Sequence, residues 1–470
     1  MGKTLFSHCR YLIMRAAPGG VVEDGAVLAD GAWIAAVGES ADLDSRFADD
    51  LGIERIDCRD KIVMPGLVDA HNHVGEAHAL LAFGWLGSPI TGLPDALERV
   101  YWPADAWLTE ESAYDLTLFG LVNLLKHGAT THANAMPHPD AAYQATADAG
   151  ARAAIHPQMV GTVSIPAGFG EAEHLALAER ALRAYHGALH GRIRVGVHPN
   201  CTFNSSEALL KRALELALEY GAQFATHIAE SPDEKERSDA LWADEGGLIA
   251  HLRRAGLLTP QTLLFHGTLL SEPEIDVLAE EDVALVHCPA TNALFGGCAY
   301  VPYMLEKGLR VGLGTDCATH NLFAVMLSVS QHHNIMPRRL RRLEPWTALA
   351  LATLGGARAL AWEAEIGSLE VGKKADVITI DLRGNSDLFP LSPEGLPDLL
   401  ALNGAGTEAC DVMVDGELLR REGAFTRMDE QAVIGRGQEW CDRFAFDYRE
   451  ALRSGKPMVK RLQEDFRRES

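Results

Sequence analysis

The sequence lacks the features that mark disulfide-rich, membrane-spanning and nucleic-acid-binding proteins. Its eight cysteines are scattered and contain no C-x-x-C pair, unlike a disulfide framework or a structural zinc site. No stretch reaches the roughly 18 apolar residues of a transmembrane helix, and the first residues form no sustained apolar segment. Basic residues number 42 against 65 acidic ones, a net charge of -23, which disfavours contact with phosphate backbones and anionic lipid. We therefore expect a cytoplasmic protein without nucleic-acid or membrane partners.

The sequence does have the length and apolar content of a large enzyme-like core. With 470 residues, 47% of them hydrophobic, it suits one α/β barrel plus an accessory domain better than three equal domains. Residues 1–60 combine short β-type runs with Asp24-Gly25 and Asp30-Gly31, which are hairpin-turn signals. The same pattern returns in residues 365–427. We expect these two parts to pair into a small composite β-sandwich domain.

Between these parts, in residues 61–364, apolar strand-like runs alternate with helix-like stretches, a pattern typical of a parallel sheet. Eight candidate strands end near His73, Met136, Val160, Pro199, Glu230, Thr268, Pro289 and Asp316. Eight such units predict a (β/α)8 TIM-type barrel with its active site at the C-terminal strand ends.

Two further segments stand out, one inside this predicted core and one after it. Residues 78–103, broken by glycine and proline, are too long for an ordinary loop and are expected to cover the substrate. Residues 428–470 are charged and helix-forming, and we expect a solvated helical extension without chemistry.

Four of the apolar runs end in residues that bind metals. His71 and His73 end the first run, and residues i and i+2 of a strand project from the same face. Histidine is the commonest metal ligand, although one such pair also arises by chance. Three later runs end in His227, His266 and Asp316, and this repeated design predicts a metal centre.

A metal held by His71, His73, His227 and Asp316, with a position left for water, has the form of a catalytic site. Such an ion lowers the pKa of bound water from 15.7 to about 7. Asp316 would bind the metal and also receive the proton of the water. His266 would either polarise the group under attack or bind the metal itself.

Glu230, three residues after His227, is expected to carry a proton to the leaving group. The alternative is that Glu230 caps the following helix, and the same alternative applies to Asp316.

These residues lie in motifs that resemble those of the amidohydrolase superfamily. The motifs are P-G-L-V-D-A-H-N-H, T-H-I-A-E, H-G, H-C-P-A-T-N and G-T-D, followed by residues 359–376. The resemblance covers residues 1 to about 430 and is closest to the branch of triazine hydrolases and adenosylhomocysteine and methylthioadenosine deaminases, related to cytosine deaminase. It implies a (β/α)8 barrel with a composite β domain and one zinc or iron ion. It also implies metal or proton-transfer roles for six residues, His71, His73, His227, Glu230, His266 and Asp316.

The resemblance also has departures. Binuclear members bridge two metals with a carboxylated lysine on strand four, but residues 193–200 contain no lysine, so we expect one divalent ion per chain. Pro199-Asn200 stands where Pro-His is usual, Gly267 follows His266 where cysteine is usual, and residues 131–136 at the end of strand two lack the acidic residue that is more usual there. These changes leave the metal site intact and alter the substrate pocket.

Five residues are candidates for contact with the substrate. Asn200, His287 and Asn292 match family positions near the substrate. His132 and His198 each end a candidate strand and could also contact it, with a hydrogen-bonded core histidine as the alternative.

The first interpretation of function is hydrolytic deamination of an amino-substituted nitrogen heterocycle, a small-molecule substrate. The alternatives are hydrolysis of an amide, urea or carbamate C–N bond, and hydrolytic dehalogenation of a triazine-like ring, because the motifs do not encode the leaving group. A non-enzymatic binding protein would have no need of Glu230, His266 and Asp316 together. We also expect a homo-oligomer.

Overall fold

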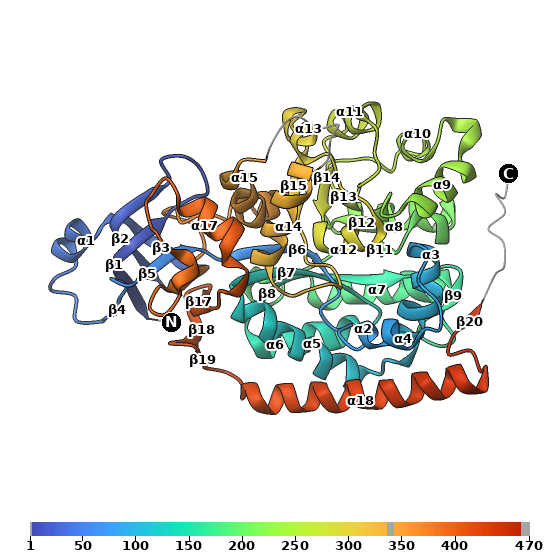
Figure 1. The fold of residues 1–470 in the computed structure, drawn as a ribbon, viewed down its shortest axis with the longest axis horizontal. Coiled ribbons are helices and arrows are strands. Elements are labelled where there is room, and N and C mark those ends of the chain that lie inside the picture. Colours follow the sequence, from blue (N-terminus) through green and yellow to red (C-terminus); the bar gives the residue numbers. More distant parts are fainter. Residues whose placement is uncertain (1, 336–342, 462–470) are drawn as a thin grey trace.

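Strands from both ends of the chain form one sheet in the computed structural model, which describes residues 2–335 and 343–461. Its order is β19-β18-β17-β16-β5-β1-β2-β3, with β4 also paired to β1. The strands are β1 (Lys3–Ile13), β2 (Val21–Asp30), β3 (Trp33–Glu39), β4 (Ile53–Asp57), β5 (Lys61–Pro65), β16 (Val377–Asp381), β17 (Ala409–Val414), β18 (Glu417–Arg421) and β19 (Ala424–Phe425). Antiparallel pairing of β5 with β16 joins the two ends, as predicted. Figure 1 shows this β domain at one end of the molecule.

One of the two predicted hairpin turns was wrong. Gly31 joins β2 to β3 with a φ of 55°, as the turn signal predicted. Asp24 and Gly25 instead lie inside β2, where the pairing with β1 shifts register between Phe6 and Cys9. Asp24 has a φ of 48°, so it adopts the left-handed conformation at an irregularity within the strand. Such irregularities favour the same residue types as turns, which explains the wrong prediction.

The body of the molecule contains two parallel sheets. One has the order β10-β8-β7-β6 with β11 paired to β8, and the other has the order β12-β13-β14-β15. Their strands are β6 (Leu67–Asn72), β7 (Ala129–Met136), β8 (Arg152–Met159), β10 (Ile193–Val195), β11 (His198–Pro199), β12 (Phe224–Ile228), β13 (Thr262–His266), β14 (Ala284–His287) and β15 (Arg310–Leu313). Isolated bridges link Asn72 to Asp316 and Val197 to Phe224. The edges of the two sheets therefore meet on both sides.

Apolar packing lies on both faces of these strands. Small and apolar side chains such as Val68, Ala133, Ala225 and Phe265 form a cluster between the strands. A larger cluster lies between the strands and the surrounding helices. The longer of these helices are α5 (Glu110–Lys126), α6 (Pro139–Ala149), α7 (Glu171–Tyr185), α8 (Glu207–Glu219), α9 (Pro232–Leu241), α11 (Glu272–Glu280) and α14 (Leu322–Ile335). Helices α5, α6, α7, α8 and α11 each return the chain to the start of the next strand, so the strands end at the same edge.

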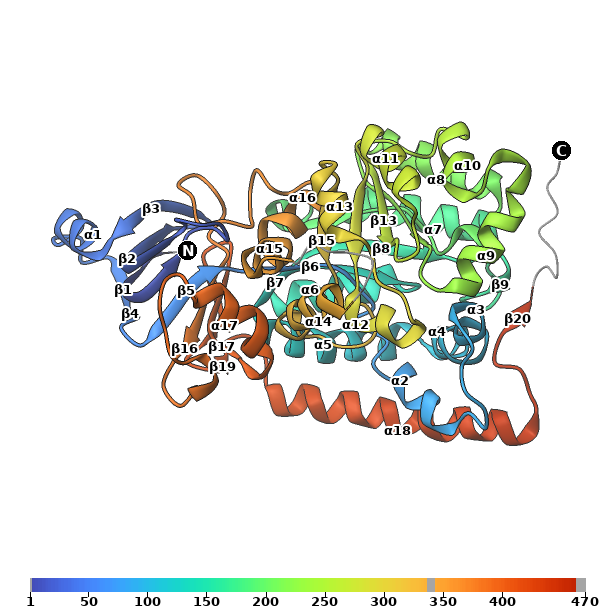
Figure 2. The same ribbon diagram turned by 45° about the horizontal axis from the view of Figure 1, so that its top comes forward.

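The segment after β6, residues 78–107, is hereafter the pocket wall. It contains only short helical pieces, α2 (Ala79–Ala82), α3 (Leu93–Ala96), a π-helical turn (Leu97–Tyr101) and α4 (Trp102–Trp107). It lies over the C-terminal ends of the strands, near α9 (Figure 2).

The C-terminal extension forms α18 (Glu430–Ser454), which runs along the outside of the body (Figures 1 and 2). The helix was predicted and most of its side chains are exposed, but it also has a buried stripe that includes Val433, Phe444 and Tyr448. After the helix, β20 (Lys460–Arg461) pairs with β9 (Val163–Ser164), and residues 462–470 of the predicted extension lie outside the described residues. Among the helices of the described residues, none combines the length and apolar character needed to cross a membrane.

Candidate metal centre and active site

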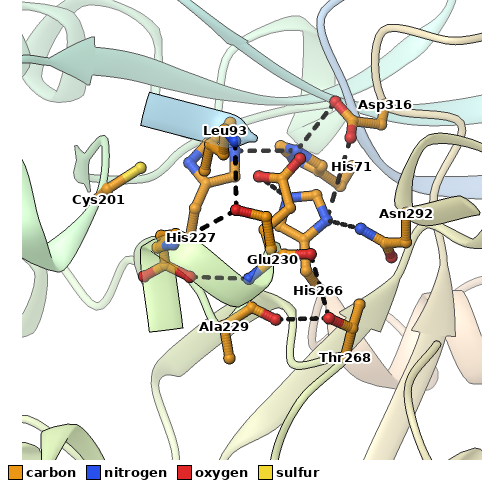
Figure 3. A network of polar contacts seen from close by, with 12 residues as sticks. His71, Leu93, Cys201, His227, Ala229, Glu230, His266, Thr268, Asn292 and Asp316 are labelled. Atoms are coloured by element: carbon orange, nitrogen blue, oxygen red, sulfur yellow. Dashed lines mark hydrogen bonds and ion pairs between the residues drawn. The ribbon is translucent and has the colours of Figure 1, made fainter. Parts of the chain in front are cut away.

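The predicted metal ligands meet at the C-terminal edge of the strands. His71 Nε2 lies 3.2 Å from His227 Nε2. Asp316 Oδ1 lies 3.8 Å from His71 Nε2 and 3.6 Å from His73 Nε2. All four side chains are buried, and Figure 3 shows His71, His227 and Asp316 directed toward one another. Ligand atoms from three separated segments therefore converge on one point.

The backbone and a buried carboxyl group fix this convergence. Asp316 has a φ of 54°, and its N–H donates to the carbonyl of His71 over 3.0 Å. Asp69, fully buried in β6, accepts hydrogen bonds from the backbone N–H and hydroxyl of Thr315 and from the amide of Asn72. Burial raises the pKa of Asp69 to about 6. Sequence reasoning did not include Asp69, although an acidic residue inside an apolar run was the signal.

The hydrogen bonds of His73 and His227 fit a metal ion. His227 Nδ1 lies 2.6 Å from the carbonyl oxygen of Asn200, and His73 Nδ1 lies 3.0 Å from Glu76 Oε1. Each Nδ1–H therefore donates outward, which leaves the Nε2 lone pair directed at the centre. Burial lowers the pKa of His227 to about 3, so the ring is neutral, as ligation requires. The Nε2 atoms of His71 and His227, 3.2 Å apart and beside the Asp316 carboxylate, could all bind one divalent cation.

Glu230 and His266 form a second polar pair beside these ligands. Glu230 Oε2 lies 3.2 Å from His266 Nε2, and the Asn292 amide donates to His266 Nδ1 over 2.9 Å. Burial, and then the carboxylate of Asp316, raise the pKa of Glu230 well above its usual range. Figure 3 shows Glu230, His266 and Asn292 as a continuous chain of contacts.

Neither carboxylate acts as a helix cap. The cap of α9 is Ser231, whose hydroxyl accepts from the N–H of Glu234. Near the start of α14, the Asn321 side chain accepts from two backbone N–H groups, while Asp316 lies several residues earlier. Both carboxylates are therefore available at the centre.

A pocket opens beside the metal centre. It is lined by His73, Glu76, Leu93, Leu97, Tyr101, Asp105, Gln158, Asn200, Cys201, His227, Glu230, Asp316 and Cys317. Its cavity volume is about 30 Å³, enough for only one or two water molecules. Four of the lining residues belong to the pocket wall, as expected for a segment that covers the substrate.

Gln158 and Asp105 are among the lining residues that were missed from the sequence. Gln158 Nε2 donates to Asp105 Oδ2 over 3.0 Å. Gln158 Oε1 and Asp105 Oδ1 are buried without a hydrogen-bond partner among the described residues. Burial, and then the neighbouring Glu76, raise the pKa of Asp105. Gln158 could have been found as a polar residue near the end of an apolar strand, but nothing in the sequence marked Asp105.

The five predicted substrate residues occupy different places. Asn200 lines the pocket, and Asn292 reaches His266. His198 lies behind the metal site, with Nε2 3.3 Å from His227 Nδ1, and His287 is buried at the end of β14. His132 lies 3.4 Å from the Thr146 hydroxyl of α6, on the helix side of β7. The structure therefore gives no support for substrate contact by His132 or His198.

Comparison with known proteins agrees with this arrangement. The 5-methylthioadenosine/S-adenosylhomocysteine deaminase of Moorella thermoacetica is 30% identical over 440 residues, which cover 92% of this chain and 97% of that protein. The crystal structure of an adenosine deaminase from Xanthomonas campestris with bound zinc is 27% identical, with a TM-score of 0.83, and covers 94% of this chain and 98% of that one. The atrazine chlorohydrolase from Arthrobacter aurescens TC1, crystallised with zinc, shares the fold with 23% identity, a TM-score of 0.78 and coverage of 93% and 100%.

A family model supports the same assignment. The model described as the amidohydrolase family matches residues 62–419, which include all six residues of the predicted centre. This confirms the resemblance seen in the motifs and the α/β fold that it implied. The chain belongs to the amidohydrolase family.

Proposed function

We propose that the protein is a metal-dependent aminohydrolase that replaces an exocyclic amino group of a nitrogen heterocycle with oxygen and releases ammonia. The observation that carries this proposal is the Glu230–His266 pair, 3.2 Å apart, beside three histidines and an aspartate. The deaminase relatives support hydrolysis at a C–N bond. Hydrolysis of amides, ureas or carbamates, and dehalogenation of a triazine-like ring, remain the alternatives because the same residues would serve each of them.

His71, His73, His227 and Asp316 would hold one divalent ion, and three histidines with one aspartate suit zinc or iron. When bound, that ion would lower the pKa of a water molecule so that it can act as the nucleophile. Glu230 Oε2 would take a proton from the water and hand it to the departing nitrogen. Asp316 would assist as a proton acceptor with the carboxylate oxygen that is not engaged in ligation.

The contact with Asn292 favours one of the two roles predicted for His266. An amide NH₂ can only donate, so His266 Nδ1 accepts from Asn292 and the ring proton lies on Nε2. A protonated nitrogen cannot bind a metal, which favours the role in which Nε2–H donates toward Glu230 or the substrate. His266 would thereby polarise the group under attack.

Asn292→Asp is expected to lower kcat about 10- to 100-fold, the usual cost of losing a partner that orients a site residue. The carboxylate would accept from His266 Nδ1–H and so move the ring proton away from Nε2. Metal content, measured by elemental analysis, should stay at the native level. An equal loss of metal would show that His266 is a ligand, contrary to this assignment.

The lining of the pocket indicates the charge of the substrate. None of the described residues that line it is lysine or arginine, while Glu76 and Asp105 face it. Asp105 Oδ1 and Gln158 Oε1 lack hydrogen-bond donors, so a substrate with donor groups on the side away from the metal would satisfy them. We propose a neutral or cationic heterocycle, such as an adenosine-type nucleoside, without phosphate groups.

Ammonia release from at least one amino-heterocycle is the expected result of a substrate screen. The panel contains aminated purine nucleosides, pterins, pyrimidines and triazines, with aryl ureas and carbamates as the alternative substrates. The 5′-monophosphate of each nucleoside is its matched control, and we expect it to be turned over far more slowly because of the acidic lining. Turnover of ureas, carbamates or amides alone would replace deamination with the second interpretation. Halide release from a chlorotriazine without ammonia release would favour the third.

We also propose a domain organisation for the chain. The bridges at both sheet edges support closure of residues 61–364 into one (β/α)8 barrel, and the β5–β16 pairing supports a β-sandwich built from residues 1–60 and 365–427. Residues 428–470 form the C-terminal extension. The cytoplasmic location and the homo-oligomer stay predictions from the sequence.

A further inference from the structure

Helix α18 packs against the outer side of the pocket wall through buried aromatic rings. The Phe444 ring is fully buried and lies 4.8 Å from the ring of His78 and 5.4 Å from that of Trp107, in edge-to-face geometry. One turn further along the helix, the Tyr448 ring lies 6.2 Å from that of Trp85. His78, Trp85 and Trp107 span almost the whole pocket wall, so these two residues of α18 contact it at both ends.

Polar contacts join the same two elements. The Tyr448 hydroxyl donates to the backbone carbonyl of Arg99, and Trp107 Nε1 donates to Asp447 Oδ2 over 2.9 Å. The carbonyl of Arg99 belongs to the π-helical turn, where regular helix hydrogen bonds are interrupted. Tyr448 therefore supplies a hydrogen bond at the point where the wall has the least support of its own.

Helix α18 is anchored to the body of the protein on both sides of its contacts with the pocket wall. Toward its N-terminus, α18 is held on α5 by Asp115, which accepts from Arg436 and Trp440. Beyond α18, β20 pairs with β9, with Lys460 opposite Ser164. The helix is thus fixed before and after the stretch that contacts the wall.

The inner side of the wall faces the metal centre. Leu97, Tyr101 and Asp105 line the pocket, and the Tyr101 hydroxyl lies 2.8 Å from the sulfur of Cys317, the residue after Asp316. One buried apolar cluster contains Tyr101 and Cys317 on the pocket side together with Phe444 and Tyr448 on the side of α18. Contacts therefore run without a break from α18 to the residue next to a metal ligand.

The wall must move for a substrate to enter, because the cavity holds no more than one or two water molecules and a heterocycle is several times larger. Its helical stretches cover residues 79–85 and 93–107, the second interrupted by the π-helical turn, and helices of this length are at best marginally stable alone. The closed position consequently depends on contacts with other elements, and α18 provides those on the outer side.

We propose that α18 is part of the substrate site, and that Phe444 and Tyr448 are positioning residues that hold the pocket wall against bound substrate. Loss of either residue lowers the population of the closed wall and weakens substrate binding, while the metal ligands stay in place. This inference rests on the proposed function in one respect, that a substrate binds between the wall and the metal centre.

The test compares Phe444→Ala and Tyr448→Phe with Phe446→Ala in the full-length, metal-loaded protein. Phe446 is the matched control, since it lies two positions from Phe444 and its ring is 65% exposed. We expect Phe444→Ala to raise KM about tenfold or more, since small displacements of positioning elements have effects of that order, and to change kcat less than KM. Tyr448→Phe, which removes one hydroxyl, should raise KM by a smaller factor. Phe446→Ala should leave both constants near the native values.

Amide hydrogen exchange gives a second readout that needs no substrate. Peptides from residues 78–107 should exchange faster in Phe444→Ala and Tyr448→Phe, and peptides from β6 and β12 should be unchanged. Faster exchange throughout the protein, or a mobile wall with native KM, would overturn the proposal. If the native protein turns over no substrate, the proposed function fails, and unchanged exchange in the wall would separately overturn the role of α18.

Discussion

Replacing Glu230 with glutamine is expected to lower kcat by at least about 100-fold and to leave the metal bound. General acid-base help typically contributes about 10²- to 10⁴-fold to the rate, and glutamine has the size of glutamate but cannot carry the proton. Glu230 is 4% exposed, so bulk water has little access to replace it. Its Oε2 lies 3.2 Å from His266 Nε2, and the amide oxygen of glutamine can occupy the same position. The variant therefore removes proton transfer and little else.

Asp316→Asn is the informative comparison for this prediction. Asp316 Oδ1 lies 3.8 Å and 3.6 Å from the Nε2 atoms of His71 and His73, so this variant should lose metal as well as activity. Elemental analysis of both variants, beside kcat on one substrate, separates the two roles. Near-native kcat in Glu230→Gln would rule out the relay at Glu230 and move that role to His266 or Asp316.

The convergence of the candidate ligands could be predicted because the position of each depends on a short local pattern. An apolar run that ends in histidine or aspartate places its last polar residue at the edge where parallel strands meet, whatever the rest of the chain does. The strand ends predicted in this way lie close to the observed ones, as at Met136 and Pro199. The glycine- and proline-rich segment that follows β6 also lies over the site, as expected from its length.

The predictions that the structure does not support depended on which face a side chain occupies. His132 was included because it ends a strand, but its neighbour Ala133 packs in the inner cluster. Adjacent residues of a strand point to opposite faces, so His132 points toward α6. The buried stripe of α18 was also visible in the sequence, since Val433, Gly437, Cys441 and Phe444 follow helical spacing. The high charge of that region concealed it.

The residues that line the pocket opposite the metal could not be predicted by such patterns. Asp105 lies in a short helix of the pocket wall, and Gln158 lies on β8. The two residues are 53 positions apart in the sequence. They come into contact only because of where the pocket wall packs, and the wall has no regular sequence pattern. Local rules predict which residues lie at the ends of parallel strands, whereas the lining opposite the metal depends on the tertiary packing of the wall.

One metal ion per chain, and its loss on removal of one ligand, is the second prediction with a large effect. The candidate ligand groups in the described part of the chain, His71-His227-His266, His71-His73-Asp316 and His266-Cys288-Asp316, all share members, so they describe a single centre. β10 and β11 place His198, and no lysine, beside His227, which leaves no bridging group for a second ion. The native protein should contain close to one equivalent of zinc or iron.

His227→Ala should lose most of this metal and nearly all turnover, because it removes one of the Nε2 atoms 3.2 Å apart and leaves an open, water-accessible coordination position. His132→Ala is the matched control: His132 is also a buried histidine at 2% exposure, but it lies on the helix side of β7, so the variant should keep its metal.

Elemental analysis and kcat should be measured on the same samples, before and after chelation and again after zinc or iron is restored. Two tightly held ions per native chain would contradict the single centre. Full metal content in His227→Ala would show that the ligand set has been assigned wrongly, since a site of four protein ligands cannot lose one of its imidazoles without weaker binding.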